Sequence, residues 1–306
     1  MMCGTTGVID HQVQCSADYV VAMSERLAHR GPDDAGTFSD GGAVGFAHHR
    51  LSILDLTSVG HQPMSCDSGR WTLVFNGEIY NCRELRHELR QAGVDFSSDS
   101  DTEVLLKAYQ VWREDCVDKI CGMYAFAVWD RDEHTLFLAC DRLGKKPLLY
   151  YWDGTTFAFA SELKAFLTLP ACERRLNPDA VDAYLSFGYI PAPLSIFRYI
   201  VKLLPGHSMT VRNGALTVRR YWFPERVAAM RSGSRTERIE QFRELFAKGS
   251  ADQLLLSGQY GAALHDYLLA IVQAPCMPKV YLKALRCLLF VIAPTWRARL
   301  FGQSAA

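Results

Sequence analysis

A thiol lies close to the start of the chain, in the sequence Met1-Met2-Cys3-Gly4. If both methionines are removed, Cys3 carries a thiol and a free α-amino group on one residue. The reference pKa of an α-amino group is about 7.7–8.0, so part of it is unprotonated near neutral pH. Such an amine can take the thiol proton, directly or through one water, which makes a nucleophile with its own base. The alternative is a cysteine that only packs.

A second candidate for chemistry is the pair Asn76-Gly77, which follows the apolar run Leu73-Val74-Phe75. An Asn-Gly pair readily adopts positive φ and forms a tight turn. The functional interpretation is an oxyanion hole, in which the Asn amide and the Gly N–H donate to a developing negative oxygen. The spacing alone leaves both interpretations open.

Arg30 and Arg50 each lie next to a sequence that favours a turn. The two stretches are His29-Arg30-Gly31-Pro32-Asp33 and Arg50-Leu51-Ser52-Ile53-Leu54-Asp55. The planar guanidinium group binds a carboxylate through two parallel hydrogen bonds, which a lysine cannot do. As isolated features, such arginines usually form ion pairs on the surface or in the core.

The composition is that of an ordinary globular protein of about two domains. Of 306 residues, 49% are apolar and 22% charged, and 33 basic residues balance 33 acidic ones. This balance gives no field that attracts nucleic acid or anionic membranes. The ten cysteines are scattered, without CxxC pairs, so neither a zinc site nor a secreted disulfide framework is expected. Without a signal peptide or an apolar run of about 18 residues, we expect a cytoplasmic protein.

The elements that must position these residues are mostly strands. Aromatic and β-branched runs predict strands over 73–75, 125–129, 135–139 and 148–151, with a hairpin turn at 130–133. Helices are expected over 17–28 and 102–112, the second capped near Ser100. Two antiparallel sheets with helices outside them would make a layered α+β domain.

Taken together, these motifs resemble the class II glutamine amidotransferases, most closely the glutaminase half of glutamine-hydrolysing asparagine synthetase. The resemblance runs in order through Met2-Cys3-Gly4, 29–33, 49–53, 75–81, 100–103, 122–127, 141–148, 160–165, 189–193 and 204–207, and it extends to about Trp222. It implies a four-layer αββα sandwich, the N-terminal nucleophile hydrolase fold, over residues 3–225.

The resemblance also implies a role for each matching site residue. Cys3 would attack the side-chain amide of glutamine and form a γ-glutamyl thioester, with Asn76 and Gly77 as the oxyanion hole. Arg50 would hold the α-carboxylate of glutamine. Glu78 and Asp101 would hold the α-ammonium group. The backbone of Ile53 and Leu54 would line the pocket.

The sequence departs from this family at both ends. Methionine removal requires a small second residue, so we expect translation to begin at Met2. At the other end, the chain has no counterpart of the pyrophosphate-binding loop of the synthetase domain, Ser-Gly-Gly-x-Asp-Ser. The most similar stretch begins Ser257-Gly258, but Gln259 replaces the second glycine, Tyr260 follows it, and the Asp-Ser pair is missing. We predict a linker over 226–238 and a short helical tail over 239–306, which is not a complete ATP-pyrophosphatase domain.

The predicted function is glutamine hydrolysis to glutamate and ammonia, with no cofactor. ATP and magnesium would be needed only if a synthetase partner supplied the missing domain and accepted the ammonia. The expected docking face is apolar, near 189–193 and 203–205. Three alternatives stay open: a silent glutamine-binding module, a truncated or fused fragment acting through its tail, and another N-terminal-nucleophile hydrolase such as an acylase.

Overall fold

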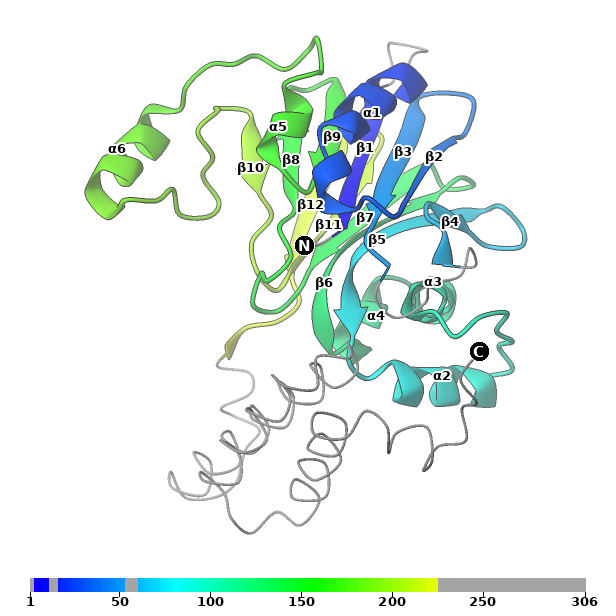
Figure 1. Cartoon of the computed structure of the whole chain (residues 1–306). Helices are drawn as coiled ribbons and strands as arrows, with labels where there is room; N and C mark the ends of the chain where they lie inside the picture. The colour runs from blue at the N-terminus through cyan, green and yellow to red at the C-terminus, as the bar shows by residue number, and fades with distance from the viewer. Residues whose placement is uncertain (1–2, 11–15, 53–59, 225–306) are drawn as a thin grey trace, which may run out of the picture. The chain divides into compact units, whose positions relative to one another are not determined.

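The computed structural model describes residues 3–10, 16–52 and 60–224. Two antiparallel sheets of six strands form the frame of this part (Figure 1). The strands of the first sheet are β1 (Gly4–Asp10), β2 (Asp34–Ser39), β3 (Val44–Arg50), β8 (Leu149–Trp152), β9 (Thr156–Ala160) and β10 (Ile200–Lys202). Those of the second are β4 (Met64–Ser65), β5 (Trp71–Ile79), β6 (Gly122–Asp130), β7 (Thr135–Cys140), β11 (His207–Arg212) and β12 (Ala215–Arg220).

The strand orders are β10-β8-β9-β1-β3-β2 in the first sheet and β12-β11-β7-β6-β5-β4 in the second. In the first sheet, the central strands β9, β1 and β3 come from distant parts of the chain. Strand β1 pairs with β3 on one side, with Gly4 opposite His49, and with β9 on the other, with Thr6 opposite Ala160. These pairings place residues from three distant stretches of the chain on neighbouring strands in the middle of the first sheet.

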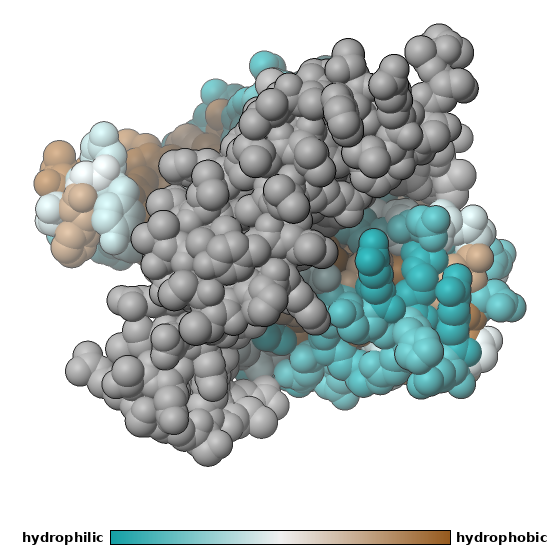
Figure 2. All heavy atoms as spheres, turned by 60° about the horizontal axis from the view of Figure 1, so that its bottom comes forward, coloured by the Kyte–Doolittle hydropathy of each residue, from teal (hydrophilic) through white to brown (hydrophobic). Residues whose placement is uncertain are grey.

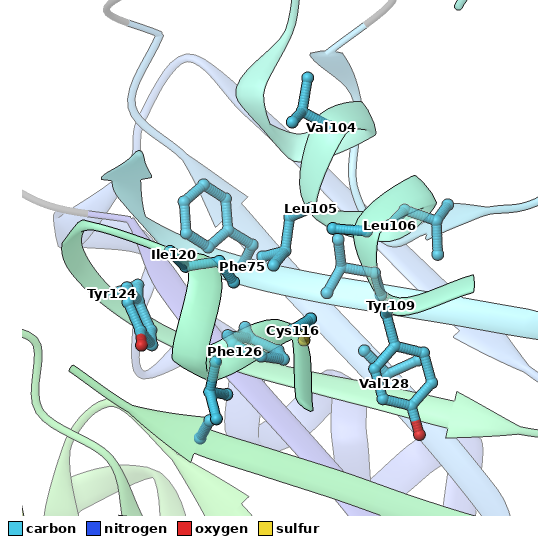
Figure 3. Packing of buried hydrophobic residues seen from close by; sticks show 14 of the residues in the cluster. Phe75, Val104, Leu105, Leu106, Tyr109, Cys116, Ile120, Tyr124, Phe126 and Val128 are labelled. Atoms are coloured by element: carbon cyan, nitrogen blue, oxygen red, sulfur yellow. The ribbon is translucent and has the colours of Figure 1, made fainter. Parts of the chain in front are cut away.

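Helices cover the outer face of each sheet. Helices α1 (Ser16–Glu25) and α5 (Leu163–Phe166) pack on the first sheet, in a cluster that includes Met23, Leu27 and Phe166. Helices α2 (Cys82–Gln91), α3 (Asp101–Trp112) and α4 (Cys116–Lys119) pack on the second. Figure 3 shows how α3 side chains such as Leu105 and Tyr109 lie over the strand residues Phe75 and Phe126.

Side-chain alternation along each strand sends every second residue between the sheets. The apolar cluster there joins residues of the first sheet, such as Phe46 and Phe159, with Val74, Ala127 and Leu138 of the second. The order helix, sheet, sheet, helix confirms the predicted α+β fold, a four-layer αββα sandwich.

The predicted strands are confirmed as parts of β5, β6, β7 and β8, and the predicted hairpin turn joins β6 to β7. Asp130 Oδ1 closes this turn by accepting hydrogen bonds from the N–H groups of Asp132 (3.1 Å) and Glu133 (3.2 Å). The first predicted helix was too long: α1 ends at Glu25, and a separate 3-10 turn follows at Ala28–Arg30. Gly31 and Pro32 come next and cannot continue a helix.

Helix α6 (Pro178–Phe187) projects away from the sheets at the left of Figure 1. It begins with Asn177, whose side chain accepts a hydrogen bond from the Asp179 N–H, and ends at Gly188 with φ of +76°. The predicted linker and tail lie outside the described residues, so the domain limits stay a prediction. Among the residues that the structure describes, no helix has both the length and the hydropathy to cross a membrane.

Candidate active site

The alternation of side chains places several polar residues at one end of the space between the sheets. On β3, His48 and Arg50 continue the inward-facing row of Val44 and Phe46. On β5, Asn76 and Glu78 continue the inward-facing row of Val74. The apolar core thus gives way to polar side chains where these two strands end.

Cys3 lies at this end of the space, directly before β1. Its Sγ atom accepts a hydrogen bond from the Leu51 N–H at 3.3 Å. Burial raises the pKa of the Cys3 thiol above its ordinary value, and this hydrogen bond and the charges of Lys146 and Arg50 offset only part of that rise. Asp101 acts in the opposite direction. The structure therefore brings Cys3, Arg50 and Asp101, three of the predicted site residues, within electrostatic reach of one another.

Arg30 anchors the backbone of Cys3. Its Nε atom donates to the Cys3 carbonyl oxygen at 2.9 Å, and one terminal nitrogen donates to Glu162 Oε1 at 2.7 Å. Glu162 also forms an ion pair with Lys164 at 3.2 Å, and its Oε1 atom lies 3.2 Å from His29 Nε2. Arg30 is buried at the end of the 3-10 turn, so its contacts with the Cys3 carbonyl and Glu162 fix the backbone of the nucleophile.

Asn76 and Gly77 lie inside strand β5, so the tight-turn interpretation is wrong. Gly77 pairs with Tyr124 of β6, and a Cβ at this position would overlap the Met123 carbonyl oxygen and the Tyr124 Cα atom. Glycine is needed here for close strand approach rather than for a turn conformation. The strand also runs farther than predicted, to Ile79.

The Asn76 side chain is almost fully buried, and its Nδ2 atom has no hydrogen-bond partner. Leaving a buried donor unsatisfied costs about 1–3 kcal/mol, so such a group in a native protein needs an explanation. A donor that awaits the oxygen of a substrate is one explanation, and it fits the predicted oxyanion hole.

Arg50 is the last residue of β3 and is buried. A Cβ at Gly60 would overlap its guanidinium group, so the missing side chain of Gly60 leaves the space that Arg50 occupies. Two predicted pocket residues, Ile53 and Leu54, lie outside the described residues.

Asp101 is the first residue of α3, and its Oδ2 atom accepts a hydrogen bond from the Ile79 N–H at 3.2 Å. Burial, with a further contribution from the charge of Glu78, raises the pKa of the Asp101 carboxyl to about 6. The two predicted ammonium-binding acids are thus close enough to interact, and Asp101 is ionised at neutral pH. A cation between them would relieve their mutual repulsion.

The sequence did not reveal His48 and Lys146, two buried residues of this site. His48 Nε2 lies 3.1 Å from the Phe75 carbonyl oxygen, and burial lowers its pKa to about 3, so the ring is neutral. A histidine in the otherwise apolar stretch Val44-Gly45-Phe46-Ala47-His48 was the available signal. Lys146 follows Lys145 in a loop, and nothing in the sequence separates the buried lysine from the exposed one.

The site therefore combines a thiol, a buried arginine, two acids and an unpaired amide donor. These groups could carry out acyl transfer from an amide that bears a carboxylate and an ammonium group. In the described part of the chain, no three His, Cys, Asp or Glu side chains are grouped to bind a metal ion.

Comparison with known proteins identifies a matching family and several relatives of this chain. A family model described as "Glutamine amidotransferase domain" matches residues 2–222. Over 259 residues the chain is 38% identical to "Asparagine synthetase [glutamine-hydrolyzing] 3" of Bacillus subtilis, covering 83% of this chain and 42% of that protein. It is 36% identical to "Putative asparagine synthetase [glutamine-hydrolyzing] 2" of Methanocaldococcus jannaschii, covering 73% of this chain and 47% of that protein. The chain thus spans less than half the length of these relatives.

Solved structures support the fold. The glutamine phosphoribosylpyrophosphate amidotransferase of B. subtilis matches 72% of this chain and 50% of its own, with a TM-score of 0.55 and 20% identity. A second structure, described as the allosteric regulatory enzyme of purine biosynthesis, matches with a TM-score of 0.56 and 20% identity, over 72% of this chain and 49% of its own.

Proposed function

Since this chain belongs to the glutamine amidotransferase domain family, we propose that it hydrolyses glutamine to glutamate and ammonia, with Cys3 as the nucleophile. The observation that carries the proposal is the environment of the thiol. Its Sγ atom accepts the Leu51 N–H, and the charges of Lys146 and Arg50 act on it, at the end of the two strands that bear Arg50 and Asn76.

The proposed reaction begins when the Cys3 α-amine takes the thiol proton. The thiolate attacks the side-chain carbonyl carbon of glutamine, and the resulting oxyanion accepts hydrogen bonds from the Asn76 amide and the Gly77 N–H. The C–N bond then breaks, and the proton on the α-amine passes to the leaving ammonia. Water attacks the γ-glutamyl thioester, which releases glutamate and restores the thiol.

Substrate recognition is assigned to groups that complement an amino acid. Arg50 binds the α-carboxylate through its two parallel N–H groups. Asp101 and Glu78 bind the α-ammonium group, and the predicted backbone contacts of Ile53 and Leu54 line the remainder of the pocket. Residues 3–225 form the amidotransferase domain in this proposal.

The proposed hydrolysis uses no cofactor, because the thiol, the amine and the oxyanion donors supply the nucleophile, the base and the charge stabilisation. ATP and magnesium enter only with a synthetase partner that consumes the ammonia. Asparagine or a related amide would then be the product, as the names of the relatives suggest. The predicted cytoplasmic location suits a catalytic thiol, which a reducing compartment keeps free.

The exposed end of α6 offers a surface for such a partner. Leu185, Phe187 and Tyr189 are 77%, 65% and 61% exposed, and this projecting segment shows brown apolar surface at the left of Figure 2. The prediction of an exposed face at 203–205 was only partly right, because Leu203 is buried in the core between the sheets.

A glutaminase assay tests the proposal. A protein whose chain begins at Cys3 should release glutamate and ammonia from glutamine, and the same protein with Cys3→Ala should release neither. With aspartate, ATP and magnesium added, the chain alone should still make only glutamate, without AMP or asparagine. Glutamine binding without glutamate release would instead identify a silent glutamine-binding module, and equal activity of Cys3→Ala would overturn the assignment of the nucleophile.

A further inference from the structure

Gln62 is a buried residue whose side chain links strand β5 to helix α3. Only 4% of Gln62 is exposed. Its Oε1 atom accepts a hydrogen bond from the Phe75 N–H at 2.6 Å, and its Nε2 atom donates to Thr102 Oγ1 at 3.3 Å. A Cβ at Gly36 of β2 would overlap the Gln62 carbonyl oxygen, so the backbone of Gln62 lies close against that strand. The side-chain amide therefore bridges β5 and α3 from a confined position.

The Phe75 N–H lies on a stretch of the β5 edge that has no partner strand in the described part of the chain. Strand β4 stops pairing with β5 at Leu73, and β6 occupies the opposite edge. Backbone N–H groups of alternate residues in a strand point to the same edge. The N–H groups of Phe75, Gly77 and Ile79 therefore face this stretch together, with that of Gly77 in the middle.

The first two residues of α3, Asp101 and Thr102, hold this edge on both sides of Gly77. Asp101 Oδ2 accepts the Ile79 N–H at 3.2 Å, two residues after Gly77. Thr102 holds the edge two residues before Gly77, through the Gln62 bridge. These two attachments thus set the direction of the Gly77 N–H, a predicted oxyanion donor.

Gln62 completes the fixation of the backbone that leads into Asn76. The Phe75 carbonyl oxygen is held separately, because it lies 3.1 Å from His48 Nε2. Without Gln62, the Phe75 N–H would lose its acceptor, and the strand would have to move to pair it. An oxyanion donor stabilises charge only where the charge develops, and a misplacement of about 1 Å can cost about a hundredfold in rate.

We propose that Gln62 is a positioning residue for the oxyanion hole, which ties β5 to the start of α3 and thereby aligns the Asn76 amide and the Gly77 N–H. Gln62 acts through Phe75 rather than on the substrate. The oxyanion exists only after the thiolate has attacked, so this role affects the transition state more than glutamine binding. The inference rests on the proposed function, because it concerns the same oxyanion, and it assigns a role to a residue that the reaction above does not use.

The test compares variants of the full chain that begins at Cys3. Gln62→Met keeps a side chain of similar length but removes both hydrogen bonds. Gln62→Glu keeps an acceptor for the Phe75 N–H, and the Thr102 hydroxyl can turn to donate to the new carboxylate. Gln91→Met is the matched control, because it makes the same change at an exposed glutamine of α2. The measurements are kcat and KM for glutamine, glutamine affinity in the Cys3→Ala background, and hydrogen exchange of the β5 amides.

We expect Gln62→Met to lower kcat by about 10–100-fold, the loss that follows when a catalytic group is misplaced by up to about 1 Å. KM and the glutamine dissociation constant should change by less than about threefold, because glutamine binding does not use the oxyanion. Gln62→Glu should keep kcat within about fivefold of wild type, because both links are kept, and Gln91→Met should match wild type. The Phe75 amide should exchange about tenfold faster in Gln62→Met, because its hydrogen bond is lost.

An unchanged kcat in a folded Gln62→Met protein, a loss confined to KM, or an equally low kcat in Gln62→Glu would overturn the inference. Unchanged exchange at Phe75 would overturn it as well, and this measurement needs no turnover. If the wild-type chain did not hydrolyse glutamine, the proposed function would fall, whereas exchange at Phe75 would still show whether Gln62 holds this strand.

Discussion

His48 Nε2 donates a hydrogen bond across the inter-sheet space to the carbonyl oxygen of Phe75, at 3.1 Å. A carbonyl oxygen only accepts, so this nitrogen carries the proton of the neutral ring. The bonded carbonyl belongs to the peptide that leads into Asn76. The first sheet therefore fixes the backbone of the second sheet at the predicted oxyanion hole.

Loss of this hydrogen bond should reduce turnover more than substrate binding. We expect His48→Leu to lower kcat for glutamine by about 10–100-fold, by analogy with the loss of hydrogen bonds that orient metal ligands, with little change in KM. His48→Gln should retain most activity, because its amide can donate from nearly the same place. His49→Gln changes the neighbouring residue on the opposite face and is the control. Equal kcat values for His48→Leu and wild type would contradict this role.

His48 should also make the fold sensitive to acid. Its folded pKa of about 3 lies below the unfolded value of 6.5, so between these values the unfolded chain binds one more proton than the folded chain. Stability is therefore lost as the pH falls from about 6.5 toward 3. Between pH 7 and 4.5, His48→Gln should lose about 2–3 kcal/mol less unfolding free energy than wild type. Urea titrations at both pH values measure this difference, and identical losses would refute it.

Asp101 should make glutamine binding depend on pH. Its pKa of about 6 means that the carboxyl is charged above pH 6 and neutral below it, and only the charged form attracts an ammonium group. In the Cys3→Ala background, where no chemistry occurs, the glutamine dissociation constant should rise as the pH falls below 6. Calorimetry across pH 5–8 measures it.

The Asp101→Asn variant should bind weakly at every pH and lose this dependence. Asp99→Asn is the matched control, because Asp99 is exposed just before α3. Retention of the full pH dependence by Asp101→Asn would show that another group titrates.

Arg50 should bind the substrate carboxylate only if the space beside Gly60 stays open for its guanidinium group. Gly60→Ala should displace the Arg50 guanidinium group and raise the KM for glutamine at least about tenfold, as should Arg50→Lys, which loses the paired hydrogen bonds. Gly42→Ala is the control, since the added methyl group there meets nothing closer than 3.5 Å. A normal KM for Gly60→Ala would mean that Arg50 does not bind the carboxylate.

The sequence was informative where one local stretch carries the signal. The strand runs of β5 to β8 were recognisable from their apolar residues. Cys3 and Arg50 were candidates from their own local sequence, whereas Asp101 was named only through the family resemblance, and the roles of all three stay predictions. Strand β1 was missed because Gly-Thr-Thr-Gly-Val-Ile-Asp has two glycines and little apolar periodicity. Helix α2 was missed because Leu85 and Leu89 are its only buried residues.

The parts of the fold and of the site that the sequence did not predict depend on contacts between residues far apart in the chain. The charge of Lys146 lowers the pKa of Cys3, which lies 143 positions away in the sequence, and Asp141 Oδ2 accepts the backbone N–H of Lys146 in the loop after β7. The partner of His48 lies on the other sheet, 27 residues along the chain. Neither relationship leaves a local pattern that sequence reasoning could detect.

The covalent intermediate on Cys3 is the most direct test of the account. A chain that begins at Cys3 is mixed with radiolabelled glutamine, quenched in acid within the first turnovers, digested and examined by mass spectrometry. We predict a γ-glutamyl group on the Cys3 thiol that hydroxylamine removes, formed no more slowly than glutamate appears. Glutamate release without any adduct on Cys3, or an adduct on a different residue, would contradict the account.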